Sequence, residues 1–434
     1  MENNVQQKTP FLRLVIASFI CLFTCIPAFV LVMAGIVQFS IIRLVGPQNM
    51  TAVFGLAGGI SGIAIVVLNP IGGFLADRTP FKFGRRRTWI LIGSVLGGLS
   101  MVMLAYAPSV PILILSYFLI QFFYGMVALS AFSLVPEQIE PSKFGKVSGI
   151  LGSAASLGIM VGFTLVGAYA EVSIIQKVIT IALVQLVASI IAVSLLKDNG
   201  YQKNTTTKNK INFLQGLKTF YPSPKKYPNF TWTVFTKFLM SMANTSLNIM
   251  SIFYIARFHL SETEIFKLNG ITGSAALLMA GAGIIGGFLS DKLKKQKIFV
   301  MGSAIFSGIC LVAFGFTFNI TLIIVGTFFF NFAYGMFNAV ENALVNRVLP
   351  SKEDAGKDIA IMNTTTQLAS SIVSFATPLL ISLGVSLMGG DGYTLYFIVL
   401  AATTVLAALT VIPIPEIGKY DGKNIDDSNE IVTE

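Results

Sequence analysis

Long apolar runs of this sequence carry side-chain amides and hydroxyls at helical spacing. Ser241, Asn244, Asn248 and Ser251 follow one another at steps of three, four and three residues, which places them on one face of a helix. An unpaired amide in lipid costs several kcal/mol, so this face should meet protein or water. Amides and hydroxyls both donate and accept hydrogen bonds, which suits them to bind a neutral polyol.

Three other runs repeat this pattern, and we expect their polar side chains to face the same cavity. The runs at 88–106, 297–318 and 392–414 contain no Asn or Gln at all. The residues predicted to bind a small-molecule substrate are Gln121, Tyr124, Asn244, Asn248, Asn331, Tyr334, Asn338, Asn363 and Gln367, with Ser370 and Ser374 on the same face as Gln367. Any one of these side chains could instead form a hydrogen bond between helices, which is worth about 0.6 kcal/mol. The stripe therefore supports the prediction better than any single member does.

Two charged residues lie well inside apolar runs of the second half of the chain, Lys237 and Glu341. Charges are expensive in lipid, so such residues are functional candidates. At 1.5 Å per residue from the same membrane face, Lys237 lies roughly 10 Å deep and Glu341 roughly 12 Å deep. We predict an ion pair that faces the cavity, with Glu341 as the carrier of a coupling proton. In the alternative, Lys237 extends to the interface and Glu341 bonds locally.

Neither catalysis nor metal binding is indicated. The single histidine, His259, lies in a loop, and Cys21, Cys25 and Cys310 lie inside apolar runs, where they serve as small core residues. No nucleophile motif or cluster of metal ligands occurs. We therefore expect no enzyme, no cofactor and no metal site.

The elements that must position the polar stripes are transmembrane helices. Hydrophobic residues make up 54% of the chain and charged residues 12%, whereas soluble domains carry about 25% charged residues. A span needs about 20 apolar residues. Such runs occur at 11–36, 51–75, 88–106, 112–135, 147–170, 174–196, 230–256, 268–290, 297–318, 320–346, 358–388 and 392–414. The sequence predicts an all-α integral membrane protein with twelve transmembrane helices.

Basic residues collect in alternate loops, such as those around Arg85 to Arg87 and Lys292 to Lys297. The positive-inside rule assigns these loops to the cytoplasm. Both termini are then cytoplasmic, and we expect a multi-pass protein of the cell membrane. The net charge of +10 arises in these separate loops, so it predicts topology and no nucleic-acid partner.

The chain is an internal duplication. Residues 72–77 read Gly-Gly-Phe-Leu-Ala-Asp, and residues 286–291, which lie 214 positions later, read Gly-Gly-Phe-Leu-Ser-Asp. Repetition at this offset predicts two pseudo-symmetric six-helix bundles. The expected division is a bundle at 1–196, a cytoplasmic linker at 197–228, a bundle at 229–416 and a cytoplasmic tail at 417–434. We expect the protein to work as a monomer.

The loop from Gly73 to Arg87 resembles the signature loop between the second and third helices of the major facilitator superfamily. Five residues separate Asp77-Arg78 from Gly84-Arg85-Arg86. This spacing is similar to that of the glycoside, pentoside and hexuronide transporters and of the sucrose-type transporters. The resemblance implies the major facilitator fold, with a substrate site between the halves near mid-membrane. It also implies a cytoplasmic gate made of Gly73, Asp77, Arg78, Gly84, Arg85, Arg86 and, in the second copy, Asp291.

This resemblance implies a secondary active transporter that moves a small polar organic solute, a sugar or glycoside, by alternating access. Proton symport is the form of coupling that Glu341, as the candidate proton carrier, would provide. The second span has no acid before Asp77, unlike the melibiose-type members, which argues against sodium coupling. The runner-up is a carrier or exporter of an amphipathic organic anion or drug, because the cavity spans are rich in Phe and Met. A membrane sensor that moves nothing is the third reading.

Overall fold

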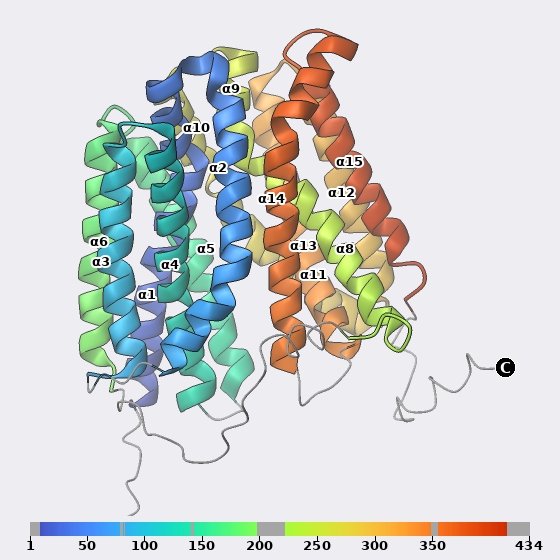
Figure 1. Ribbon diagram of the computed structural model, residues 1–434. Helices are drawn as coiled ribbons and strands as arrows, with labels where there is room; N and C mark the ends of the chain where they lie inside the picture. The colour runs from blue at the N-terminus through green and yellow to red at the C-terminus, as the bar shows by residue number, and fades with distance from the viewer. Residues whose placement is uncertain are drawn as a thin grey trace, which may run out of the picture.

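The computed structural model describes residues 9–78, 81, 83–139, 143–197, 222–348 and 355–414. Within these residues the chain is all helix, and the helices stand side by side in two groups (Figure 1). The first group is α1 (Phe11–Leu31), η1 (Val32–Ile36), α2 (Val37–Arg78), α3 (Arg85–Ala105), α4 (Val110–Gln138), α5 (Phe144–Ala168) and α6 (Ile174–Leu195). The second group is α8 (Pro228–Thr245), η3 (Ser246–Ile249), α9 (Met250–Phe258), α10 (Glu262–Thr272), α11 (Ala275–Leu293), α12 (Gln296–Phe316), α13 (Ile320–Val348), α14 (Ala355–Met388) and α15 (Tyr393–Thr410).

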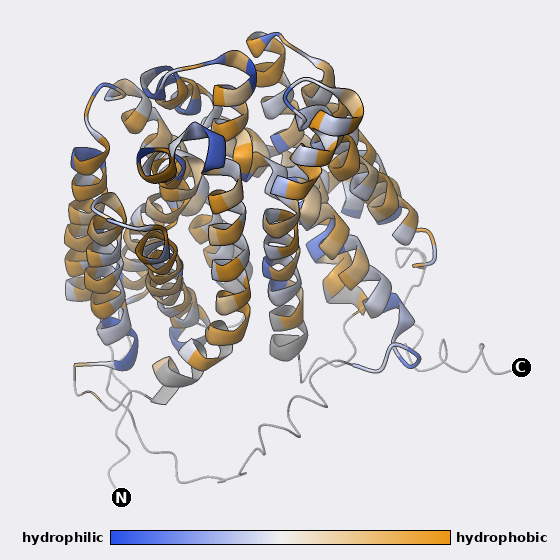
Figure 2. Ribbon diagram, turned by 45° about the horizontal axis from the view of Figure 1, so that its top comes forward, coloured by the Kyte–Doolittle hydropathy of each residue, from blue (hydrophilic) through white to orange (hydrophobic). Residues whose placement is uncertain are grey.

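The twelve predicted crossings are present in the described chain. Eleven helical stretches are long and apolar enough to cross a membrane, and the first of them is Phe11–Leu68. That stretch turns at Gly46, where φ is 74° and ψ is 169°, a conformation that favours glycine. The chain therefore crosses once before Gly46 and once after it. Apolar residues cover much of the outer faces of the helices, as lipid contact requires (Figure 2).

Three predicted spans differ from continuous α-helices, and the first of them contains the π-helical turn η1 after α1. The seventh is α8, η3 and α9, and the eighth is α10 and α11. Helix α10 begins at Glu262, six residues before the predicted start of that span, because Ser261 and Glu264 cap it reciprocally. The Ser261 amide donates to Glu264 Oε2 at 2.8 Å, and the Glu264 amide donates to Ser261 Oγ at 3.4 Å. This Ser-x-x-Glu capping box was readable in the sequence.

We name the two ends of the bundle by their residues. The basic end carries Arg85 to Arg87 and the last turn of α11, and the opposite end carries Arg257 and Asp391. The two groups of helices approach each other at the opposite end and diverge toward the basic end (Figure 1). At the closed end α2 lies on α14 so tightly that a Cβ at Gly55 would lie 2.7 Å from the carbonyl oxygen of Ser374.

A buried arginine ties the opposite end of the second group together. Arg257 donates from Nε to Asp391 Oδ2 at 2.6 Å and from Nη2 to Asp391 Oδ1 at 2.7 Å. Its Nη1 donates to the carbonyl oxygens of Phe314 and Gly315 at 2.9 and 2.8 Å. Burial by itself raises the pKa of Asp391, but hydrogen bonds from Arg257 and from the Tyr393 amide hold that pKa below its ordinary value.

Asp391→Asn should lower the midpoint of thermal unfolding by several degrees, because it leaves the Arg257 charge buried without its partner. A depressed pKa contributes stability above the ordinary aspartate pKa of about 4 and loses it as the pH falls through the lower folded value. The difference from wild type should thus persist from about pH 5 to 8 in a detergent-solubilised melt. Glu171→Gln is the control, since its pair with Lys267 is exposed and 3.5 Å long. Equal midpoints for Asp391→Asn and wild type at pH 7 would contradict the assignment.

Candidate functional site

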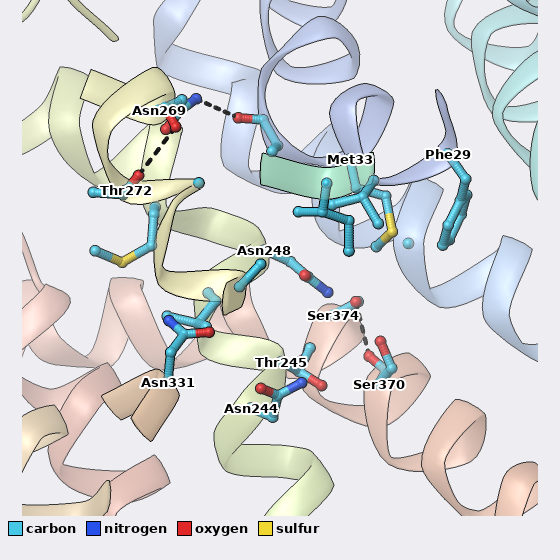
Figure 3. Close-up of a pocket in the computed structure, with 18 of the residues that line it drawn as sticks. Phe29, Met33, Asn244, Thr245, Asn248, Asn269, Thr272, Asn331, Ser370 and Ser374 are labelled. Carbon is cyan, nitrogen blue, oxygen red and sulfur yellow. Dashed lines mark hydrogen bonds between the residues drawn. The ribbon is translucent and has the colours of Figure 1, made fainter. Parts of the chain in front are cut away.

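A cavity of about 400 Å³ lies between the two groups of helices. This volume is in the range of sites for small organic molecules. One wall is formed by α1, η1, α2, α4 and α5, and the other by α8, η3, α9, α10, α11, α13 and α14. Figure 3 shows Asn244 and Asn331 on one side of the cavity and Phe29 on the other, with Asn248 and Met33 between them.

The second half of the chain supplies most of the polar wall. Its polar lining residues are Ser241, Asn244, Thr245, Asn248, Tyr254, Asn269, Thr272, Thr327, Asn331, Thr366, Gln367, Ser370 and Ser374. Few of their hydrogen bonds restrain the amide groups: Asn331 Nδ2 donates to the Thr327 carbonyl oxygen at 2.8 Å, which leaves its carbonyl oxygen and second proton for a ligand. The polar stripe of the seventh span, from Ser241 through Asn248, faces this cavity.

The first half of the chain supplies a mainly apolar and aromatic wall. Phe29, Met33, Phe54, Ile159 and Phe163 contribute to it. Its amide is Gln121 on α4, which is half-buried, and its phenol is Tyr117. No described residue that lines the cavity carries a formal charge. The site is therefore neutral, with one polar wall and one apolar wall.

Five of the nine predicted binding residues line the cavity: Gln121, Asn244, Asn248, Asn331 and Gln367. The other four lie elsewhere. The Tyr124 side chain is 2% exposed and points at α3, where its hydroxyl donates to Met101 Sδ at 3.2 Å. Tyr334 stacks along its own helix with ring centroids 6.3 and 6.4 Å from its neighbours. Asn338 accepts a hydrogen bond from Lys237 through Oδ1. Asn363 lies on α14 with its side chain exposed, and it does not line the cavity.

Lys237 and Glu341 form a buried ion pair beside the cavity. Lys237 Nζ lies 2.8 Å from Glu341 Oε2 and donates to Asn338 Oδ1 at 3.0 Å. The side chains are 10% and 0% exposed. Within the described residues, Glu341 Oε1 is buried and has no hydrogen-bond partner. Ser241, one turn further along the same helix, lines the cavity, so the pair lies next to the cavity floor on the side of the basic end.

The arginine loop is built around a glutamate that the sequence analysis did not include. Arg85 Nη2 lies 2.7 Å from Glu137 Oε1. Arg86, which is buried, donates to the same oxygen from Nε at 2.9 Å. Gly84, which precedes α3, has a φ of 114° that favours glycine. Glu137 ends α4 at the basic end, and an acid beside an arginine-rich loop was the signal in the sequence.

The remaining predicted gate residues are only partly described. Gly73, Asp77 and Arg78 lie on α2, but their surroundings fall outside the described part of the structure. Asp291 lies in the last turn of α11 with its side chain exposed. The predicted contact of Asp77 with the arginines therefore stays a prediction.

Comparison with known proteins identifies the family. The family model of the Major Facilitator Superfamily matches residues 14–374. The chain belongs to this superfamily. Among curated proteins, the multi-drug resistance efflux pump PmrA of Streptococcus pneumoniae serotype 4 is 27% identical over 260 residues, which are 59% of this chain and 62% of that protein. The general alpha-glucoside permease of Schizosaccharomyces pombe is 25% identical over 134 residues, or 27% of this chain and 24% of the permease.

A solved member of the superfamily has the same fold. The D-xylose-proton symporter superposes with a TM-score of 0.69 at 18% identity, over 94% of this chain and 99% of the symporter. Membership in the superfamily and its membrane-spanning helices make the chain a multi-pass membrane protein, as the signature loop and the repeat predicted. The chain spans 62% of the efflux pump and 24% of the permease.

In this superfamily member, the lining residue that sequence reasoning missed most clearly is Asn269. It lies on α10 and lines the cavity although it is only 7% exposed. The predicted span began at 268, so Asn269 fell at its very start, and no polar stripe was assigned to that span. The capping box at Ser261, followed by Asn269 and Thr272 three residues apart, would have placed both on a helix face.

Proposed function

We propose that this transporter carries an uncharged polar organic solute, a sugar or a glycoside, by alternating access. The observation that supports this proposal is the neutral cavity with amides and hydroxyls on one wall and aromatic rings on the other. A polyol needs many donors and acceptors and an apolar platform. The loop spacing after Asp77 and the alpha-glucoside permease among the relatives agree with it.

The binding residues under this proposal are Gln121, Asn244, Asn248, Asn331 and Gln367. The gate at the basic end would use Gly73, Asp77, Arg78, Gly84, Arg85, Arg86 and Asp291, with Glu137 as the partner of the arginines. The basic end would lie on the cytoplasmic side of the cell membrane, because this end carries the basic loops. The working unit would be a monomer of two six-helix bundles joined by residues 197–228.

Proton coupling is proposed for the Lys237–Glu341 pair. A buried carboxylate with one oxygen free of partners can take up a proton, and its neutralisation would release the lysine. The pair lies beside the cavity, so a change in it would reach Ser241 through one turn of α8. The proton gradient would then drive accumulation of the solute.

A second candidate is export of an uncharged amphipathic drug. The apolar wall with Phe29, Met33 and Phe54 favours it, and the relative PmrA is named a multi-drug resistance efflux pump. An organic anion fits less well, because the described lining residues hold no cation to pair with it.

Asn331→Leu and Asn244→Leu should each weaken the binding of a transported glycoside by about threefold to tenfold, since each removes a hydrogen bond between neutral groups. Asn363→Leu is the matched control, because Asn363 is an exposed amide that does not line the cavity. Binding to the purified protein in detergent measures the effect. Equal affinities for all three variants would overturn the assignment of the cavity as the binding site.

A further inference from the structure

Two spans that line the cavity leave α-helical geometry at equivalent places in the repeats. Val32–Ile36 forms a π-helical turn between α1 and α2, and Ser246–Ile249 forms a 3-10 turn between α8 and α9. Val32 and Ser246 are 214 residues apart, the same offset as the repeated Gly-Gly-Phe-Leu motif. Turns of these kinds inside helices often mark hinges or functional sites. The duplication has thus kept an irregular turn at the same depth in both halves.

Side chains of each half reach the backbone of the irregular turn in the other half. Ser251 Oγ and Asn269 Nδ2, from the second half, both donate to the carbonyl oxygen of Ala34, at 2.5 and 2.9 Å. Gln38 Nε2, from the first half, donates to the carbonyl oxygen of Asn248 at 3.0 Å. Ser251, Asn269 and Gln38 are all buried. Figure 3 includes the bond from Asn269 at the upper edge of the cavity.

An aromatic ring closes over the same place. Phe266, one turn before Asn269 on α10, packs against Phe39 of α2 with ring centroids 5.4 Å apart. Lys177 of α6 places Nζ 4.0 Å from the centroid of the Phe266 ring. A Cβ at Gly35 in the π-helical turn would lie 2.9 Å from the Phe266 ring, so any larger residue there would require the ring to shift. Helix α10 therefore inserts into the first half at the opposite end.

We propose that Gln38, Ser251, Phe266 and Asn269 form a latch that shuts the opposite end of the cavity, and that Asn269 is its ligand-sensitive member. The proposal rests on the proposed alternating-access function, in which this end must open. Asn269 lines the cavity and also donates a hydrogen bond to Ala34 of the other half. The side chain of Asn248 likewise lines the cavity while its carbonyl oxygen accepts from Gln38.

This geometry connects occupancy of the cavity to closure. A ligand shifts a conformational equilibrium only through contacts that differ between the two states. A solute bound to the Asn248 amide fixes the 3-10 turn whose backbone the latch grips, so binding favours the closed latch. The latch itself contains no ionisable group, and Lys177, which faces Phe266, donates to the carbonyl oxygens of Ala170 and Val172 at 2.7 and 2.6 Å.

The test measures the distance between two spin labels, one at Tyr169, which follows α5, and one at Met388, which ends α14. Both residues are exposed, and both lie at the opposite end of the bundle, one in each half. The labels are attached to cysteines introduced at these two positions, because the three native cysteines are buried. Asn269→Leu should raise the ratio of long to short distances about fivefold in lipid nanodiscs without solute, because it removes the neutral hydrogen bond that Asn269 donates to Ala34 of the other half. Ser251→Ala, a smaller change, should shift it in the same direction.

Thr272→Val is the matched control. Thr272 lines the same cavity from the same helix, but its hydroxyl donates to the carbonyl oxygens of Leu268 and Asn269 within that helix. If neither Asn269→Leu nor Ser251→Ala moves the distance ratio beyond that of Thr272→Val, the latch is wrong. Failure of the proposed function would give a different result: Asn269→Leu would still shift the distances, but the protein would take up no solute.

Discussion

Glu341→Ala is expected to abolish accumulation of solute and to slow solute exchange by about 100-fold or more. The substitution leaves Lys237 buried without its partner, 2.8 Å from where the carboxylate stood, and breaking such a pair costs about 3–5 kcal/mol. Lys237→Ala should be similarly damaging to exchange. The double variant Lys237→Ala with Glu341→Ala removes both buried charges, so its exchange should be faster than that of either single variant.

Reconstituted vesicles separate the two effects. Exchange of labelled for unlabelled solute needs no proton, whereas accumulation against a gradient does, and the double variant should recover only exchange. Thr236→Val is the control for changes at this position of α8, because Thr236 bonds to Thr410 and not to the pair. Losses of exchange that simply multiply in the double variant would mean that the two residues act independently.

The second large effect is expected from Gly55→Val on α2. A Cβ at this position would lie 2.7 Å from the Ser374 carbonyl oxygen and 2.8 Å from Pro378 Cγ, and backbone and proline atoms cannot turn aside. The substitution should hold the halves apart at the opposite end and reduce transport at least about tenfold, since the cycle would lack its closed state. Steady-state uptake in proteoliposomes measures the loss.

Gly125→Val is the matched control, because a Cβ at Gly125 on α4 would meet no atom within 4 Å. Both variants carry the same cost of a β-branched residue in a helix. A comparable loss of uptake in the two variants would show that helix propensity, and not the α2–α14 seam, explains the defect.

The transmembrane architecture was predictable because its causes are local in the sequence. Apolar length fixed the spans, and the offset between Asp77 and Asp291 fixed the two repeats. The ion pair of Lys237 with Glu341 could also be predicted, because two opposite charges at the same depth in a membrane have few other partners.

Other features of the structure come from contacts that the spacing of residues in one helix does not encode. Tyr124 shares a helix face with Gln121 in the sequence, yet its hydroxyl bonds to Met101 of α3 and the side chain does not line the cavity. The 3-10 turn in the seventh span accepts a hydrogen bond from Gln38 of the other half at the Asn248 carbonyl oxygen. A periodic pattern in one helix says nothing about a partner more than 200 residues away.

The asymmetry of the cavity could not be read from the duplication. Repeated halves predict equivalent residues, as with Gln121 and Asn331, which lie 210 residues apart and both line the cavity. Most other polar lining residues nevertheless belong to the second half. Divergence after duplication has given one half the hydrogen-bonding wall and the other the apolar wall, which suits a ligand with two unlike faces.

The central claim is that this superfamily member moves an uncharged polar solute through the cavity between its halves. Uptake of a panel of radiolabelled sugars and glycosides, against organic anions of similar size, into proteoliposomes with and without an imposed proton gradient tests it most directly. The account predicts that at least one neutral glycoside is taken up, faster with the proton gradient, and that Asn331→Leu slows this uptake while Asn363→Leu does not. Uptake of the anions alone, or uptake that Asn331→Leu leaves unchanged, would contradict it.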